Sequence, residues 1–469
     1  MLTQMMKSKK VFLIGGGAVL VCIAALVVIL FFVRREPLRE QIVLTYANPN
    51  LGVGADAALE LRMLQSFMNE NPHIRVEIDQ INIDTTGVAI PWMEGLTASA
   101  ARERLPDVFV VDDLGAAAGS GWLLNLTPMA WSDIDFVDLP SNIQEANLLN
   151  WVVYTLPFSQ DIQGYFVNRD LFRNLGLVPP SFGVSAEMFM SAIRATTDLT
   201  LPLVSLNHTF SFVDWYPGAI NPQLGFFAFD GLNFALNSPE MLEAVSQAAD
   251  IYNGGFTFYG IPMGSVRDYF PVGYDLGAFR YGQMAMFYGG VGLMEHMVNQ
   301  LTFDWDFIGV PGGRSVVTLE LIGISAYTQH PAEAYQLAAW MGHSTEGNLR
   351  RLEYAVEMGI IPDAFPVNQN PRVLEALTQI IPASGLAEIY SAMDRALVDG
   401  HAVLPGYGQA RFSAPTGVAI QGTHHTNAPI NPLIRYSIIG DLDFAAHSAV
   451  AEYVAREQLE AARDGFRVN

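Results

Sequence analysis

Residues 154–177 constrain the fold more than any other stretch of this chain, because they combine two strand-like runs, a polar segment between them and a helix start within a short distance. A strand-like run ends at 156–157, and a second strand-like run covers 164–167. Asn168 follows at once and is a favoured residue type for the start of a helix. The segment between the two runs is polar: Ser159, Gln160 and Asp161. The stretch therefore predicts two strands joined by a polar segment, followed by a helix.

Residues 11–33 form an uninterrupted apolar run near the N-terminus. At about 1.5 Å per residue this run is long enough to cross a hydrocarbon core of roughly 30 Å. A cleaved signal peptide would have a shorter apolar core followed by a cleavage site with small residues, but here Arg34 and Arg35 follow directly. Cys22, the sole cysteine, has no lipobox around it, so we expect a retained anchor over 11–33, a cytoplasmic tail over 1–10 and a linker over 34–41.

The charge of the chain excludes a class of partners. The formal net charge is −22, and because residues 1–35 carry +5, the remainder carries −27. Such a domain repels nucleic acid, so a DNA- or RNA-binding role is excluded. Basic residues flank both sides of the apolar run, so they do not decide its orientation in a membrane.

The portion after residue 35 is too long for one core and predicts two lobes. Residues 41–46 and 76–81 read as strands, and 55–68 between them has apolar residues at helical spacing. This strand–helix–strand opening predicts a mostly parallel sheet with helices on its faces. Further on, Ser238 and Pro239 predict a helix start, which Gly254 and Gly255 would end.

Seven segments of the chain carry recognisable motifs: 71–77, 105–112, 121–128, 154–177, 282–290, 307–313 and 324–335. In their order and rough spacing they resemble one protein family, the extracellular solute-binding proteins of the carbohydrate-uptake ABC transporter type (family 1, similar to maltose- and glycerol-phosphate-binding proteins). Two places depart from the family pattern. Residues 181–187 replace the usual Thr-Trp-Asp-Glu helix start, and the tryptophan expected shortly after Gly290 is absent.

The resemblance implies an α/β, two-lobed periplasmic-binding-protein-like (Venus flytrap) fold, preceded here by one N-terminal transmembrane helix. Lobe 1 would comprise 42–158 plus 320–361, and lobe 2 would comprise 162–318 plus 362–469. The ligand would lie between the lobes, at the carboxyl ends of the strands, where open parallel sheets bind ligands. The last helix is expected over 442–464, and the domain after residue 35 is expected outside the cytoplasm.

A sugar site needs planar polar side chains and aromatic plates. In lobe 1 the candidates follow predicted strands: Tyr46 and Asn48 after the first, Asp112 and Asp113 after the run 108–111. For the two aspartates, capping of a helix is the alternative. The other candidates of this group lie where the chain crosses between the lobes. Ser159, Gln160 and Asp161 are expected both to contact ligand and to act as a hinge. For Glu320, an interlobe salt bridge or a solvated turn is the alternative to a ligand contact.

In lobe 2, Phe212, Trp215 and Tyr216 form an aromatic cluster, from which Trp215 and Tyr216 are predicted to contact ligand. Tyr288 and Gly290 belong to the family's strand-to-helix turn, where glycine lets backbone N–H groups approach a ligand. The missing tryptophan leaves room for a bulkier or different solute.

No catalytic or metal-binding motif emerges, so an enzyme, a cofactor and a metal site are not expected. His424 and His425 have no acidic or cysteine partner at ligand spacing for a metal. Glycoside hydrolysis needs two carboxylates on either side of the bond that is cut, and the adjacent Asp112 and Asp113 do not provide that arrangement.

The resemblance implies a single-pass, membrane-anchored binding protein that captures a sugar or oligosaccharide outside the cytoplasm and delivers it to ABC permease subunits by hinge closure. A ligand-binding sensor domain for a signalling receptor and, less favoured, a carbohydrate-active hydrolase are the alternatives. The sequence names neither the solute nor the permease.

Overall fold

The computed structural model describes residues 41–51, 54–83, 89–262 and 264–465. The predicted span 11–33, the tail before it and Cys22 lie outside these ranges. Among the helices that the structure does describe, none combines the length and apolar character needed to cross a membrane.

One eight-stranded sheet runs through the molecule, with the strand order β2-β1-β3-β9-β6-β7, while β8 pairs with β6 and β10 with β9. A separate hairpin is formed by β4 and β5. The strands are β1 (Ile42–Ala47), β2 (Ile74–Ile78), β3 (Val108–Val111), β4 (Leu148–Leu149), β5 (Val152–Val153), β6 (Thr155–Asn168), β7 (Met286–Gly290), β8 (Trp305–Phe307), β9 (Val316–Ile324) and β10 (Leu397–Val398).

The predicted strand–helix–strand opening is confirmed. β1 pairs in parallel with both β2 and β3, and α2 (Gly54–Glu70) connects β1 to β2. The expectation of a mostly parallel sheet is wrong beyond these strands, because β9 pairs antiparallel with β3 and β6, and β7 and β8 pair antiparallel with β6. β9 crosses the middle of the molecule in the direction opposite to β6, so these two strands pair antiparallel.

The two strands predicted in 154–177 are a single long strand, β6. The polar residues do not interrupt it, and the only irregularity is a register shift against β9 between Pro157 and Ser159. Asn168 caps the following helix, its Oδ1 accepting a hydrogen bond from Leu171 N at 2.9 Å, as predicted.

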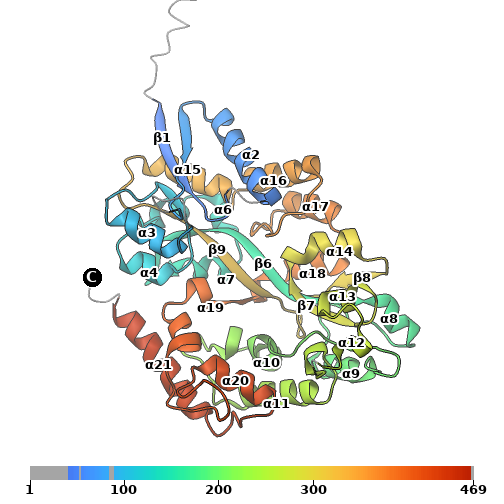
Figure 1. Ribbon diagram of the computed structural model, residues 1–469. Coiled ribbons are helices and arrows are strands. Elements are labelled where there is room, and N and C mark those ends of the chain that lie inside the picture. The colour runs from blue at the N-terminus through green and yellow to red at the C-terminus, as the bar shows by residue number, and fades with distance from the viewer. Residues whose placement is uncertain (1–40, 52–53, 84–88, 263, 466–469) are drawn as a thin grey trace, which may run out of the picture.

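Helices cover the sheet on both sides of β6 and β9 (Figure 1). Before β6 they are α2, α3 (Trp92–Ala100), α4 (Leu114–Gly119), α5 (Thr127–Ala130), α6 (Ile134–Val137) and α7 (Ser141–Ala146). Between β6 and β9 they are α8 (Arg169–Asn174), α9 (Ala186–Ala195), α10 (Phe212–Ile220), α11 (Pro239–Asn253), α12 (Val266–Tyr269), α13 (Asp275–Arg280) and α14 (Met294–Gln300). After β9 they are α15 (Pro331–Met341), α16 (Thr345–Met358), α17 (Pro371–Ile380), α18 (Ser384–Ser391), α19 (Gly400–Val403), α20 (Ile430–Ile438) and α21 (Ser448–Gly465).

Short turns complete the chain: 3-10 turns at η1 (Phe226–Ala228), η2 (Phe258–Gly260), η3 (Val291–Leu293) and η4 (Met393–Arg395), and a π-helical turn at η5 (Gln409–Ser413). The start and end predicted for α11 are confirmed, since Ser238 caps it, Pro239 is its first residue and Gly254 follows its last. The closing helix α21 begins at Ser448, six residues later than 442.

Two clusters of buried hydrophobic residues pack along the long strands. The larger contains Leu44, Phe109, Leu156 and Ile322, and the second is built around Tyr165, Phe172, Trp215 and Ile434. In Figure 1, β6 and β9 connect a part that holds β1, α2, α15 and α16 with a part that holds α10, α11, α20 and α21. We call these parts lobe 1 and lobe 2, and their residue boundaries remain a prediction.

Candidate functional site

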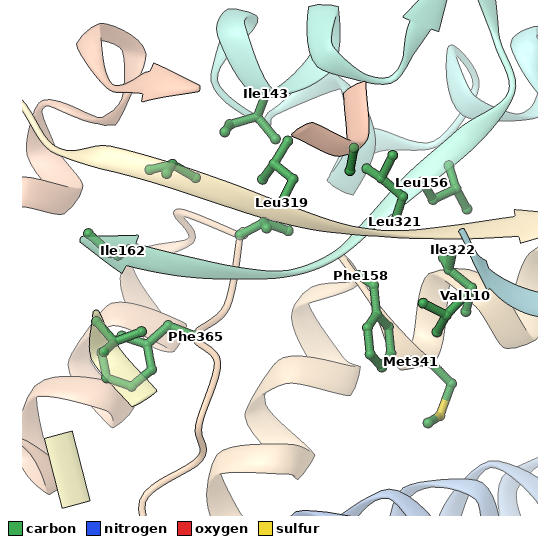
Figure 2. Packing of buried hydrophobic residues seen from close by; sticks show 14 of the residues in the cluster. Val110, Ile143, Leu156, Phe158, Ile162, Leu319, Leu321, Ile322, Met341 and Phe365 are labelled. Atoms are coloured by element: carbon green, nitrogen blue, oxygen red, sulfur yellow. The ribbon is translucent and has the colours of Figure 1, made fainter. Parts of the chain in front are cut away.

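The candidate site lies beside the point where β6 and β9 carry the chain between the lobes. Ser159 is paired with Glu320 in the strand register, and Ser159 Oγ donates a hydrogen bond to Glu320 Oε2. The register shift next to this pair changes the direction of Phe158. In Figure 2, Leu156 and Leu321 lie on one side of the strands, whereas Phe158 points to the other side, toward Met341.

Two adjoining cavities, which we call the cleft, meet at this point. One has a volume of about 640 Å³ and the other of about 330 Å³. Both are lined by Asn48, Pro49, Asn50, Phe158 and Glu320. The larger is also lined by Ala55, Asp56, Glu60, Ser159, Glu295, Arg351, Pro362, Asp363 and Ala364. The smaller is also lined by Val110, Val111, Asp112, Thr318, Leu319, His401 and Ala402.

The loop after β1 supplies the first wall of the cleft. Asn48 is held in place because its Oδ1 accepts from Asn50 N at 2.9 Å and its Nδ2 donates to Tyr46 Oη at 3.3 Å. Tyr46 itself is fully buried in β1. The prediction that Tyr46 contacts ligand is therefore wrong for this structure, because the parallel pairing of β1 with two strands encloses its ring.

The two aspartates after β3 have different surroundings. Asp112 is exposed and lines the smaller cavity with His401, and partial desolvation raises the pKa of its carboxyl. Asp113 caps α4, its Oδ1 accepting from Ala116 N at 2.8 Å. Asp113 lines a separate cavity of about 430 Å³ between α4 and α21 and neither cavity of the cleft. The structure therefore shows the capping role of Asp113, and its ligand role stays a prediction.

The polar residues after Ser159 lie behind the cleft. Gln160 is fully buried, and its Nε2 donates to Pro366 O at 2.7 Å. Its main chain also pairs with Phe365, so Gln160 ties a third segment to the crossing. The predicted contact of Gln160 with ligand is wrong, because no part of its side chain is exposed.

Asp161 is partly exposed, and its Oδ1 accepts from Val291 N at 2.9 Å. Burial raises the pKa of its carboxyl. Gly290 lies directly beside it at the end of β7. Neither residue is among those that line the two cavities of the cleft.

The aromatic cluster of lobe 2 is core rather than a ligand platform. Trp215 is fully buried, with ring centroids 5.0 Å from Phe212, 5.9 Å from Phe189 and 6.1 Å from Tyr165. The predicted stacking role of Trp215 is therefore wrong, because α10 turns this face toward α9 and β6.

Tyr216 is also buried, and its hydroxyl donates to Glu243 Oε1 at 2.9 Å, so its predicted ligand role is wrong too. Tyr288 is 9% exposed, and its hydroxyl donates to Gln163 Oε1 at 3.1 Å. Burial raises its pKa well above the ordinary value, so the phenol is neutral.

Sequence reasoning missed the charged residues that line the larger cavity. Glu60 of α2 and Arg351 of α16 form an ion pair, with side chains 8% and 13% exposed. Arg351 also donates to Met341 O at 2.9 Å, and its Cζ lies 5.6 Å from the centre of the Phe158 ring. The sequence held one signal for this ion pair. Glu60 is spaced to share a helix face with the apolar Leu64 and Phe67, and a charge buried on such a face needs a partner.

Three further carboxylates were missed: Asp56, Glu295 and Asp363. Burial, Asp56, Glu295 and Glu320 raise the pKa of Asp363 from its ordinary 3.8 to about 6. Burial is also the largest cause that raises the pKa of Glu320. Carboxyls that repel one another in this way bind protons more readily than isolated ones.

Metal-binding geometry is absent from the described part of the chain: no group of three or more His, Cys, Asp or Glu side chains there is arranged to hold an ion.

Comparison with known proteins gives a consistent picture of the fold. No family model matches the sequence, and no curated protein matches it significantly. Solved structures do match. A cyclic α-maltosyl-1,6-maltose binding protein from Arthrobacter globiformis superposes with a TM-score of 0.65 at 18% identity, over 90% of this chain and 99% of that one.

Two more structures agree. The sugar-binding protein MalE from Xanthomonas citri matches with a TM-score of 0.65 at 15% identity, over 91% of this chain and 100% of its own. An ABC substrate-binding protein from Listeria monocytogenes in complex with cycloalternan matches with a TM-score of 0.61 at 17% identity, over 91% and 98% of the two chains. The chain therefore has the two-lobed α/β fold of ABC-transporter sugar-binding proteins.

Proposed function

We propose that this chain is the extracytoplasmic substrate-binding component of an ABC importer, which captures a sugar or oligosaccharide in the cleft and delivers it to a membrane permease. The observation that carries the proposal is the position of the cleft, beside the two long strands that join the lobes. The volume of the larger cavity, about 640 Å³, lies within the range of roughly 300–1,000 Å³ typical of small-molecule sites.

Four of the residues predicted from the sequence line this cleft: Asn48, Asp112, Ser159 and Glu320. Their amide, carboxylate and hydroxyl groups suit the hydroxyls of a sugar. The three solved structures above are sugar or ABC substrate-binding proteins, which favours transport over the sensor and hydrolase alternatives.

A thermal-shift screen of the full chain against a library of sugars tests the proposal. A ligand at 100 times its dissociation constant adds about 2.7 kcal/mol to the free energy of unfolding, which is readily detected. Asp112→Asn and Ser159→Ala should reduce the shift caused by any sugar that binds. If no sugar or oligosaccharide raises the melting temperature, the proposed substrate class fails.

The anchor belongs to the same proposal: residues 11–33 hold the protein in the cell membrane with the binding domain outside. Intact-mass analysis of protein from the membrane fraction tests it. A mature N-terminus beyond residue 30 would show that the segment is cleaved instead.

A further inference from the structure

The larger cavity of the cleft carries a pronounced excess of negative charge. Five carboxylates and one cation line it: Asp56, Glu60, Glu295, Glu320, Asp363 and Arg351. Arg351 is already paired with Glu60. The cavity lining therefore holds four carboxylates with no cation of its own to balance them.

One of the acceptors in the cavity wall is unpaired. Glu60 is 6% exposed, and its Oε1 accepts a hydrogen bond from Arg351. Its Oε2 is buried and has no hydrogen-bond partner among the described residues. A buried carboxylate oxygen without a donor is costly, so a donor group on a ligand in this cavity would stabilise it.

The remaining carboxylates also lie close together. The main-chain N–H of Asp363 points to Asp56 Oδ1 at 3.4 Å, and Asp56, Glu295 and Glu320 all raise the pKa of Asp363. Repulsion among them falls when a positive charge enters the cavity, so a cationic ligand would gain interaction energy that a neutral one would not.

We propose that the cleft selects a solute that carries an ammonium group on a polyhydroxyl body, that is, an amino sugar or an aminated oligosaccharide. This inference rests on the proposed function and names its substrate class. An ammonium group has three donors and no acceptor, which matches a wall of carboxylate oxygens. Pro49 and the exposed Asn50, which line the same cavity, would then contact the sugar body.

Uronic acids and sugar phosphates are excluded by the same charges, because each would add a negative group to a cavity that already repels one. The net charge of −27 after residue 35 further concentrates cations near the protein and speeds their association at low salt.

Calorimetry of the full chain in detergent tests the proposal with four probes, each of them a tetrasaccharide. Their units are glucosamine, N-acetylglucosamine, glucose with maltose-type linkages, and galacturonate. We expect the glucosamine tetramer, at a pH at which its amines are charged, to bind at least about tenfold more tightly than the N-acetylated tetramer, which has the same size without the charge. Galacturonate should not bind.

Glu295→Gln and Asp363→Asn should each reduce this preference, whereas Glu375→Gln, which removes an exposed carboxylate of α17 outside the cleft, should leave it unchanged. Equal affinity for the amino and N-acetylated probes, or tighter binding of the neutral glucose oligomer, would overturn the inference and leave the sugar-binding function intact. Spermine, a polyamine without a sugar body, is measured as a fifth probe, and its binding in the absence of any sugar binding would overturn the amino-sugar assignment. If no probe binds, the amino-sugar inference fails, and the proposed function is decided separately by the screen against the sugar library.

Discussion

A Cβ atom built on Gly290 would lie 2.3 Å from Oδ1 of Asp161, so this carboxylate occupies the space that any side chain at position 290 would fill. The two residues lie on the paired strands β7 and β6, and Val291 N donates to the same oxygen at 2.9 Å. The absence of a side chain at Gly290, at the predicted strand-to-helix turn, therefore makes room for the Asp161 carboxylate.

Gly290→Ala should destabilise the fold by about 1–3 kcal/mol, because the added methyl group forces Asp161 out of its hydrogen bond with Val291. Urea denaturation measures the change. Gly408→Ala is the matched control, since a Cβ at Gly408 meets no heavy atom within 4 Å. Equal denaturation midpoints for the Gly290 variant and the unmodified protein would show that the space is free.

Arg351→Met should cost about 3–5 kcal/mol of stability, because it leaves the buried Glu60 carboxylate without its cation. The double variant Glu60→Gln with Arg351→Met should recover much of this loss, since no unpaired charge remains. Chemical denaturation of the two single variants and the double variant gives the coupling energy. A coupling below about 0.5 kcal/mol would mean that the two residues act independently.

Trp215→Ala should destabilise lobe 2 by about 3–5 kcal/mol, since it removes a fully buried indole from among Tyr165, Phe189 and Phe212. Trp151→Ala is the control, because Trp151 is 89% exposed and its loss should change stability by about 0.5 kcal/mol or less. Trp215→Phe keeps much of the packing and should bind ligand as tightly as the unmodified protein. Weaker binding by a well-folded Trp215→Phe variant would restore Trp215 to the site.

Trp215 shows why the site was only partly predictable. Residues at the ends of strands, such as Asn48 and Asp112, could be placed at the cleft because the topology of a parallel sheet brings strand ends together. An aromatic cluster carries no such information, because a buried face and a ligand platform need the same residue types. Only the packing of α10 on its neighbours decides between them.

The charged wall of the cleft could not be found for a different reason. Glu60 and Arg351 are 291 positions apart, and no local pattern links α2 to α16. The two helices become neighbours only because β9 returns the chain to lobe 1. More of the fold than of the site could be predicted from the sequence. Local propensity and spacing predict β1, α2, β2 and the caps of α8 and α11.

Stability should depend on pH through Asp363. Its pKa is raised from 3.8 to about 6 in the folded chain, so folding favours the protonated form. The resulting contribution to stability is complete below pH 3.8 and is lost as the pH rises through about 6. Asp363→Asn should remove this part of the pH dependence, whereas the same change at the exposed Asp441 should not. Denaturation curves measured on either side of pH 6 test it, and an unchanged dependence in Asp363→Asn would assign the effect to another group.

Closure of the cleft should accompany binding. The lobes are joined by β6, by β9 and by the segment that pairs Gln160 with Phe365 through main-chain bonds of 3.0 and 2.9 Å. Rotation about so few strands strains only a small number of backbone torsions. A ligand that contacts Asp112 on lobe 1 and Glu295 on lobe 2 gains all its contacts only when the lobes are close, and it therefore shifts the population toward the closed state.

Small-angle scattering should show a smaller radius of gyration with the bound sugar than with an equal concentration of a sugar that does not bind. Identical scattering profiles at saturating ligand would rule out closure as the signal that the permease reads.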